Sequence, residues 1–222
     1  MSGRTGTGLP DGHPGGLNLT ARLFELGGYA VNPAGSFREP EGEITAPLSV
    51  LDLGAGEGAA VRFLRGNGYR AEGIDLFPGS KDVKNQDMCR LPWGEASYDI
   101  CLAECSLSSC KERPEALREA YRVLKPLGKL LVSDVFFRKK EDLGPQLPGD
   151  LSWEGWRRTF AGAGFRICAM KDESRLWKEF FLESLWNGNA DECFSEFYRT
   201  AGRAGCGYYL ACLEKGAEHG TV

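Results

Sequence analysis

Residues 50–58 read Val-Leu-Asp-Leu-Gly-Ala-Gly-Glu-Gly, and residues 73–76 read Gly-Ile-Asp-Leu. An apolar run enters a glycine-rich turn, a helix-like stretch leaves the turn, and a second apolar run ends in an acid. This order is typical of a nucleotide-binding α/β unit. Glycine lets the backbone of such a turn approach a ligand closely, where any Cβ would clash. Asp75 stands about 20 residues after the turn, where an acid can accept hydrogen bonds from both hydroxyls of a ribose.

Two other nucleotide-binding motifs fit this stretch less well. No Gly-Lys-Ser or Gly-Lys-Thr follows the glycines, which disfavours the phosphate loop of an NTPase. The dinucleotide-binding pattern G-x-G-x-x-G requires glycine at position 59, where this chain has Ala59. Dehydrogenases also usually lack an acid at the place of Asp52, before the first glycine. Both differences disfavour a nicotinamide dehydrogenase.

Residues 51–58 resemble the first motif of class I S-adenosylmethionine (SAM)-dependent methyltransferases. Residues 86–93 (Gln-Asp-Met-Cys-Arg-Leu-Pro-Trp) and 118–130 carry the same resemblance. In the second of these segments, Leu127 replaces the first glycine of the family's Arg-Val-Leu-Lys-Pro-Gly-Gly turn. The matches together span about residues 48–172. The resemblance implies SAM as the cofactor, S-adenosylhomocysteine (SAH) as the product and a small-molecule acceptor.

Strand-like and helix-like stretches alternate along the chain, which predicts a mainly parallel sheet with helices on both faces. We predict an α/β fold of the Rossmann-like, doubly wound type, with a mostly parallel seven-stranded sheet. The resemblance implies that the last strand is antiparallel, and extra helices are expected before it. One helix is expected to begin at Pro114 and to end at Pro126. Strands are expected at residues 48–53, 69–76, around Val83, 98–103, 129–134, 165–170 and 208–213.

The chain of 222 residues is expected to form one domain. Residues 1–14 are rich in glycine, threonine and proline, which predicts a flexible N-terminus. We assign residues 15–222 to a class I methyltransferase domain, with a cap helix at about 15–28 and a helical insert at about 174–204. A second helix of this aromatic insert is predicted to start near Asn189 or Asp191. The insert either sets acceptor selectivity or buries a homodimer surface.

The resemblance also implies roles for individual residues. Asp75 would bind the ribose, because a carboxylate accepts two donors at once. Asp87 would accept a hydrogen bond from the adenine amino group, with Met88 and Leu76 on the two faces of the ring. Asp52 would orient the glycine turn or bind the ammonium group of the ligand. The residues expected to bind the cofactor are Asp52, Gly54, Ala55, Gly56, Asp75, Leu76, Asp87, Met88 and Ala103.

Methyl transfer from a sulfonium is an in-line displacement, for which the protein mainly aligns the acceptor and excludes water. Residues 103–106 match the family stretch that faces both the ligand's amine and the acceptor. Small-molecule members often carry a different polar pair there, so Glu104 is a departure that can reflect the choice of acceptor. Glu104 and Cys105 are the candidate catalytic residues, and the catalytic group itself stays open. The alternative for Glu104 is a solvated loop acid.

Two further functions stay open beside a small-molecule methyltransferase. Cys101, Cys105 and Cys110 lie at or just after the fourth predicted strand, near the expected acceptor. Thiolates there could bind trivalent arsenic, as in arsenite methyltransferases, although the same cysteines could simply fill the core. The second alternative is a non-catalytic module that binds SAM but whose acceptor pocket is blocked.

Composition narrows the partners and the location. The net charge of −4 disfavours a nucleic acid, because phosphate recognition needs a concentrated basic surface. Eight cysteines without a Cys-x-x-Cys pair, and only two histidines, disfavour a metal site. No apolar stretch reaches the length of a membrane span or resembles a signal peptide, so we expect a soluble protein of the cytoplasm.

Overall fold

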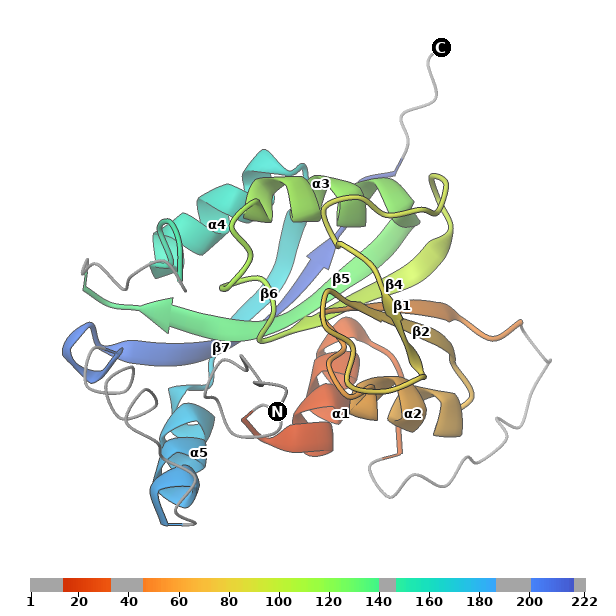
Figure 1. The fold of residues 1–222 in the computed structure, drawn as a ribbon. Coiled ribbons are helices and arrows are strands. Elements are labelled where there is room, and N and C mark those ends of the chain that lie inside the picture. Colours follow the sequence, from red (N-terminus) through yellow and green to blue (C-terminus); the bar gives the residue numbers. More distant parts are fainter. Residues whose placement is uncertain (1–13, 33–45, 140–146, 187–200, 218–222) are drawn as a thin grey trace, which may run out of the picture.

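The computed structural model describes residues 14–32, 46–139, 147–186 and 201–217, which form a seven-stranded sheet between two layers of helices (Figure 1). The strands are β1 Ser49–Leu53, β2 Arg70–Asp75, β3 Val83–Asn85, β4 Tyr98–Glu104, β5 Leu124–Phe137, β6 Arg166–Asp172 and β7 Cys206–Glu214. The helices are α1 Gly16–Gly27, α2 Ala59–Gly66, α3 Arg113–Val123, α4 Trp153–Gly162 and α5 Ser174–Trp186.

The strand order in the sheet is β3-β2-β1-β4-β5-β7-β6. The pairs among β1 to β5 are parallel, whereas β7 lies antiparallel between β5 and β6. This arrangement confirms the predicted fold class. The strand order reverses between β1 and β4, and ligands of open α/β sheets bind beyond the carboxyl ends of the strands at such a reversal. The glycine turn follows β1, so the topology places it at this position.

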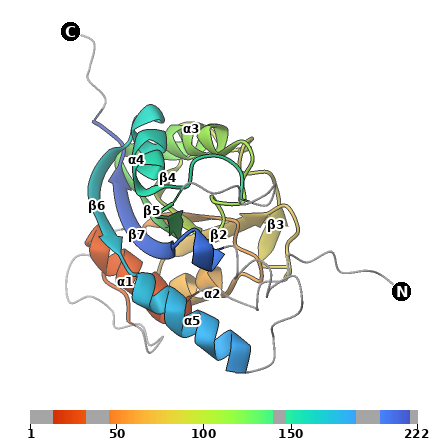
Figure 2. The ribbon, with the colours of Figure 1, turned by 90° about the vertical axis from the view of Figure 1, so that its left-hand side faces the viewer.

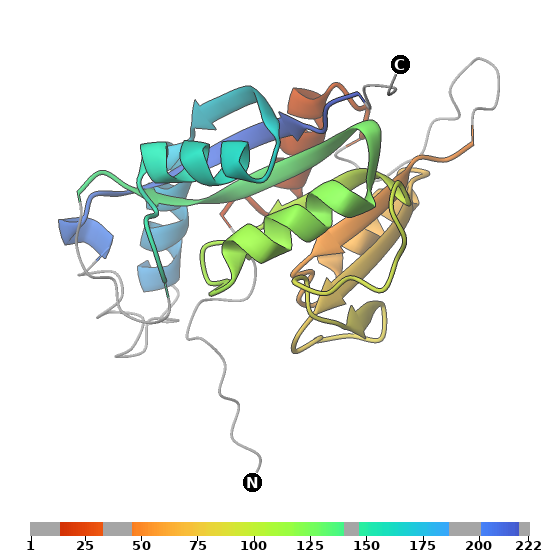
Figure 3. The ribbon, with the colours of Figure 1, turned by 90° about the horizontal axis from the view of Figure 1, so that it is seen from above.

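Helices cover both faces of the sheet because its central strands are apolar on both sides. All five residues of β1 are buried, as expected of a strand with helices above and below. Helices α3 and α4 lie on one face, whereas α1, α2 and α5 lie on the other (Figures 1 and 2). Viewed from above, α3 and α4 lie across the same face of the sheet (Figure 3). Helix α3 faces the sheet with its buried residues Ala116, Leu117, Ala120 and Val123.

The structure corrects two predicted boundaries. The helix expected to end at Pro126 ends at Val123, and β5 begins at Leu124 and contains Pro126. Strand β5 also extends to Phe137, because its final residues pair with the start of β7 at Cys206. Helix α1 occupies the place predicted for the cap helix, and α5 forms the first part of the predicted insert. The helix start expected near residues 189–191 lies outside the described residues, as does most of the predicted flexible N-terminus.

Among the described residues, no helix is both long and apolar enough to cross a membrane.

Candidate cofactor site

The glycine turn after β1 has a backbone that other residues adopt only with strain. Gly54, Gly56 and Gly58 have φ angles of 84°, 51° and 75°. A Cβ on Gly54 would lie 2.4 Å from the Cβ of Ser106, in the loop after β4. The N–H groups of Gly54 and Ala55 both donate to the carbonyl of Ile74 at 2.9 Å, which ties the turn to the end of β2. Glycine at position 54 therefore allows two strand ends to meet.

Asp75, the last residue of β2, holds the turn from its other side. Its Oδ2 accepts a hydrogen bond from the N–H of Gly56 at 2.9 Å, and its Oδ1 accepts one from the N–H of Phe77 at 2.8 Å. The side chain is half-buried. A carboxylate has about four lone-pair sites, so both oxygens keep acceptor capacity for the hydroxyls of a ligand.

Two further carboxylates are buried next to the turn. Asp52 of β1 is 3% exposed and Glu104 of β4 is 9% exposed. The hydroxyl of Thr20, on α1, donates to both oxygens of Glu104, at 3.0 Å to Oε2 and 3.3 Å to Oε1. Among the described residues, no group donates a hydrogen bond to Asp52, and no lysine or arginine pairs with Asp52 or Asp75. The site therefore places carboxyl groups without a cationic partner where water is excluded.

Burial shifts the acidity of both side chains. Burial, and then the negative charges of Glu104 and Asp75, raises the pKa of Asp52 well above its ordinary value. Burial raises the pKa of Glu104 to about 8, and the hydrogen bond from Thr20 opposes that rise. Such shifts gather where a protein binds a charged ligand or moves a proton. A cationic ligand would compensate the carboxylates.

Glutamine at position 104 is expected to make the ligand-free protein more stable in alkaline solution. Between the ordinary pKa of 4.5 and the native value of about 8, the folded protein binds more protons at Glu104 than the unfolded chain does. The contribution of Glu104 to the unfolding free energy is therefore largest below pH 4.5 and is lost as the pH rises towards 8. Above about pH 8, we expect Glu104→Gln to melt about 5 °C higher than the wild type. The difference should shrink as the pH falls.

Thermal melts of the two proteins over this range test the effect. Thr20→Val is the matched variant, because loss of the hydroxyl should raise the pKa of Glu104 further and extend the loss of stability to higher pH. A difference in melting temperature between wild type and Glu104→Gln that stays the same at every pH would contradict the raised pKa.

The residues predicted to contact adenine lie along one rim of the turn. Asp87 caps its own turn, since its Oδ1 accepts from the N–H of Cys89 at 2.8 Å. The side chain of Met88 packs near the glycine turn, 3.5 Å from where a Cβ on Gly54 would lie. Leu76 is 54% exposed and Phe77 is 88% exposed, so two large apolar side chains next to Asp75 are open to solvent. Ala103 is fully buried in β4.

The structure separates the three cysteines that the sequence places together. Cys101 is fully buried in β4, and the thiol of Cys110 lies against Cys89. Cys105 has a φ of 52°, and its Sγ lies 3.0 Å from the hydroxyl of Tyr208 on β7. Within the described part of the chain, no three His, Cys, Asp or Glu side chains are arranged to hold a metal ion. The three thiols therefore do not form one arsenic site, and Cys101 fills the core as the second interpretation expects.

Two residues of the site, Thr20 and Phe77, were not predicted from the sequence, and neither was the contact that Ser106 makes. Thr20 is a polar residue on the buried face of α1, which is a signal that sequence reasoning could have used. Phe77 follows the ribose acid directly and is almost fully exposed. Ser106 donates to the carbonyl of Leu53 at 2.6 Å and so joins the loop after β4 to the end of β1. Nothing in the local sequence indicates that contact.

The arrangement fits SAM. A Cβ on Gly56 would meet nothing within 4 Å, so the turn is open on its outer side. Buried Asp52 suits an ammonium group, Asp75 suits a ribose, and the exposed apolar side chains suit an adenine ring. The anionic pyrophosphate of a dinucleotide, in contrast, would be repelled by the same carboxylates.

Comparison with known proteins agrees with this class. Residues 51–132 match the family model described as "Methyltransferase domain". The malonyl-[acyl-carrier protein] O-methyltransferase of Serratia marcescens is 34% identical over 105 residues, which cover 43% of this chain and 41% of that protein. The arsenite methyltransferase of Aquipseudomonas alcaligenes is 28% identical over 150 residues, covering 52% of this chain and 43% of that protein. The chain thus spans less than half the length of these curated relatives.

A solved structure shares the fold over most of the chain. The geranyl diphosphate C-methyltransferase of Streptomyces coelicolor A3(2), in complex with SAH, superposes with a TM-score of 0.71. It is 14% identical, and the match covers 90% of this chain and 79% of that structure. The matched methyltransferase domain and the strand order are those of a class I SAM-dependent methyltransferase. Members of this family use SAM, which confirms the predicted cofactor.

Proposed function

We propose that the protein transfers the methyl group of SAM to a small-molecule acceptor. The observation that carries the proposal is buried Asp52, which receives no hydrogen bond from the described residues and lies beside the open glycine turn. SAM carries an ammonium and a sulfonium, and these positive charges match a site with Asp52, Asp75 and Glu104. The sulfonium supplies a methyl group that is already activated for displacement.

The residues of the chain bind and orient the cofactor in this proposal. Asp75 accepts hydrogen bonds from the two ribose hydroxyls, and Asp52 binds the ammonium group next to the backbone of residues 54–56. The adenine ring lies between Met88 and Leu76, and Asp87 accepts a hydrogen bond from the adenine amino group. The backbone of β4 at residue 103 borders the reacting end. Phe77 is added to these contacts, because its exposed ring stands next to the ribose acid.

Glu104 is proposed to take the proton that the acceptor loses. The carboxylate lies at the end of β4, near Asp52 and against Thr20 of α1, where it can face the transferred methyl group. Its raised pKa of about 8 is near the operating range of a general base. Thr20 is a positioning residue, because its hydroxyl binds both carboxylate oxygens. Cys105 and Tyr208 form the adjoining wall, and Trp177 of α5 stacks on Tyr208 at 6.3 Å.

Calorimetry with SAH tests cofactor binding, and labelled SAM with a panel of amines, hydroxyls and carboxylic acids tests transfer. We expect SAH to bind and NADH not to bind. We also expect Glu104→Gln to retain its SAH affinity while losing at least about 100-fold in turnover. A protein that gives neither heat nor a melting shift with SAM or SAH would refute the proposal. Binding without turnover across the panel would instead support the non-catalytic module.

A methyltransferase for arsenite is the second candidate. Two observations favour it: an arsenite methyltransferase is among the relatives, and the Cys105 thiol lies next to Glu104 in the chain. Burial raises the pKa of Cys105 well above its ordinary value, which disfavours a free thiolate without a bound ion. A wild-type protein that does not methylate arsenite would exclude this candidate, and arsenite methylation that survives in Cys105→Ala would exclude a role for that thiol.

The seven described cysteines are all free, which supports a location in the reducing cytoplasm. The role of the aromatic insert, as acceptor wall or homodimer surface, stays a prediction.

A further inference from the structure

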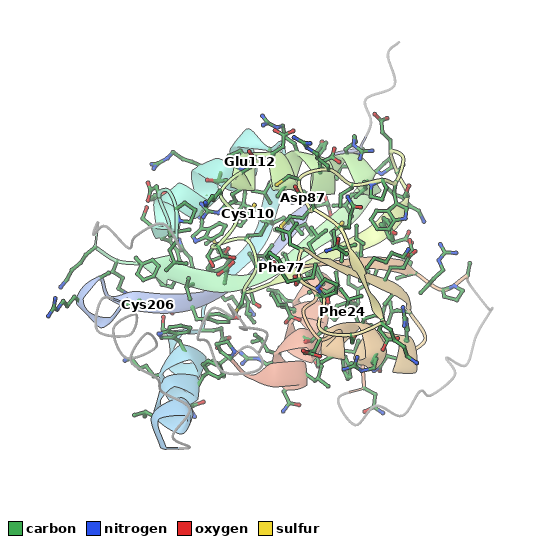
Figure 4. The ribbon with its side chains drawn as sticks, viewed as in Figure 1. Phe24, Phe77, Asp87, Cys110, Glu112 and Cys206 are labelled. Carbon is green, nitrogen blue, oxygen red and sulfur yellow. The ribbon has the colours of Figure 1, made fainter. Side chains whose placement is uncertain are left out.

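Two thiols meet beside the candidate cofactor site. The Sγ atoms of Cys89 and Cys110 lie 3.7 Å apart. Cys89 belongs to the turn capped by Asp87, and Cys110 lies in the loop between β4 and α3. In Figure 4, Cys110 lies near Asp87 and Glu112, and well away from Cys206 at the start of β7. The Sγ of Cys89 also lies 3.7 Å from the carbonyl oxygen of Glu112.

A small molecule can approach the pair beside Cys89, and Cys110 itself is half-buried. A cavity of about 460 Å³ lies next to it, lined by Cys89, Arg90, Glu112, Pro114, Glu115 and Arg118. Two arginines and two glutamates in one wall complement the carboxylates and ammonium groups of a zwitterionic peptide. Oxidised glutathione is a disulfide of that class.

We propose that Cys89 and Cys110 form a modification site, at which a low-molecular-weight disulfide of the glutathione class converts the two thiols into a reversible disulfide bond. The bond would close a ring between the segment after β3 and the loop after β4. The two loops border the glycine turn through Met88 and Ser106.

The order of the two steps follows from the surroundings of each thiol. Burial raises the pKa of both thiols, but the contact with Cys89 and the charge of Arg113 oppose the rise at Cys110. Cys110 therefore ionises first and attacks one sulfur of the small disulfide, whose S–S bond breaks and releases one thiol. Cys89 then loses its proton to solvent, attacks the Sγ of Cys110 and releases the second thiol. Two cysteine thiols are oxidised, and one disulfide is reduced to two thiols.

The bond is expected to weaken cofactor binding. The sulfur atoms must approach from 3.7 Å to about 2.05 Å, which draws the two loops together. The N–H of Cys89 donates to Asp87, and Met88 between them lies against the glycine turn, so the segment shifts with Cys89. We expect the affinity for SAH to fall at least about fivefold. This consequence rests on the proposed function, whereas formation of the disulfide does not.

The full chain, treated with oxidised or reduced glutathione, tests the site by peptide mapping and by SAH calorimetry. We expect a linkage of Cys89 to Cys110 in the wild type, weaker SAH binding, and recovery of both thiols and affinity with dithiothreitol. Cys89→Ser should trap glutathione on Cys110. The matched control is Cys168→Ser, which removes an exposed thiol of β6 and should leave the linkage unchanged.

Three other outcomes would refute the site, its coupling to the cofactor, or the proposed function. Glutathione on Cys168 without any linkage of Cys89 to Cys110 would overturn the site, because the reagent would then have been active. A linkage that leaves SAH affinity unchanged would overturn the coupling to the cofactor. Reduced wild type that fails to bind SAH would refute the proposed function. Peptide mapping would then still decide whether the disulfide forms.

Discussion

Replacing Asp75 by alanine is expected to weaken SAH binding by at least about 100-fold. A hydrogen bond to a charged acceptor contributes about 1.5–3 kcal/mol, and two ribose hydroxyls would lose this carboxylate together. The variant also removes the acceptor of the N–H groups of Gly56 and Phe77, so the turn loses order at the same time. Isothermal titration calorimetry with SAH measures the effect.

Two controls separate the ligand contact from the turn. Asp75→Asn keeps an acceptor for one N–H but removes the charge, and its affinity should lie between those of wild type and Asp75→Ala. Asp82→Asn removes a nearby surface acid that pairs with Arg62 and Arg65, and should leave SAH affinity within about twofold. Undiminished affinity in Asp75→Ala would contradict the ribose assignment.

Gly54→Ala is expected to lower the unfolding free energy by about 3–5 kcal/mol and to abolish SAH binding. The added Cβ would lie 2.4 Å from the Cβ of Ser106, and the φ of 84° disfavours any side chain. The two strand ends that meet at this contact must then separate, and the turn between them changes shape. Chemical denaturation measures the stability, and calorimetry measures the binding.

Two variants separate the conformational cost of the positive φ from the cost of the clash with Ser106. Gly56→Ala also has a left-handed φ, of 51°, but its Cβ would meet nothing within 4 Å, so it reports the conformational cost alone. Gly54→Ala combined with Ser106→Gly removes the clash and should recover part of the stability. Equal stability of Gly54→Ala and Gly56→Ala would show that the contact with Ser106 is unimportant.

The fold could be predicted because its signals are local. Apolar runs such as β1 are buried on both faces, and turns and helix stops separate them from the helices. The reversal of direction at β7 came only from the family resemblance, since no periodicity indicates it. The boundary of α3 was wrong by three residues because Pro126 is accommodated in the first residues of β5 rather than in the turn that ends the helix.

The site residues could be predicted only where the sheet topology brings the ends of strands together. The carboxyl ends of β1, β2 and β4 meet by topology, so Asp52, Asp75 and Glu104 come together. The contact between Thr20 and Glu104 joins residues that are 84 positions apart. The polar residue on the apolar face of α1 is visible in the sequence, but its partner is not. The separation of the three cysteines could not be predicted, because the backbone adopts a left-handed φ at Cys105 and the loop after β4 then brings Cys110 against Cys89, a residue far away in the sequence.

The position of β7 has a consequence for biosynthesis. This strand is the last one among the described residues, yet it pairs with β5 on one side and with β6 on the other. While the chain leaves the ribosome, β5 and β6 therefore have no partner to join them until residues 206–214 emerge. Completion of the sheet must follow translation of this strand, and a nascent chain stalled before it would present two open edges to chaperones or to other chains.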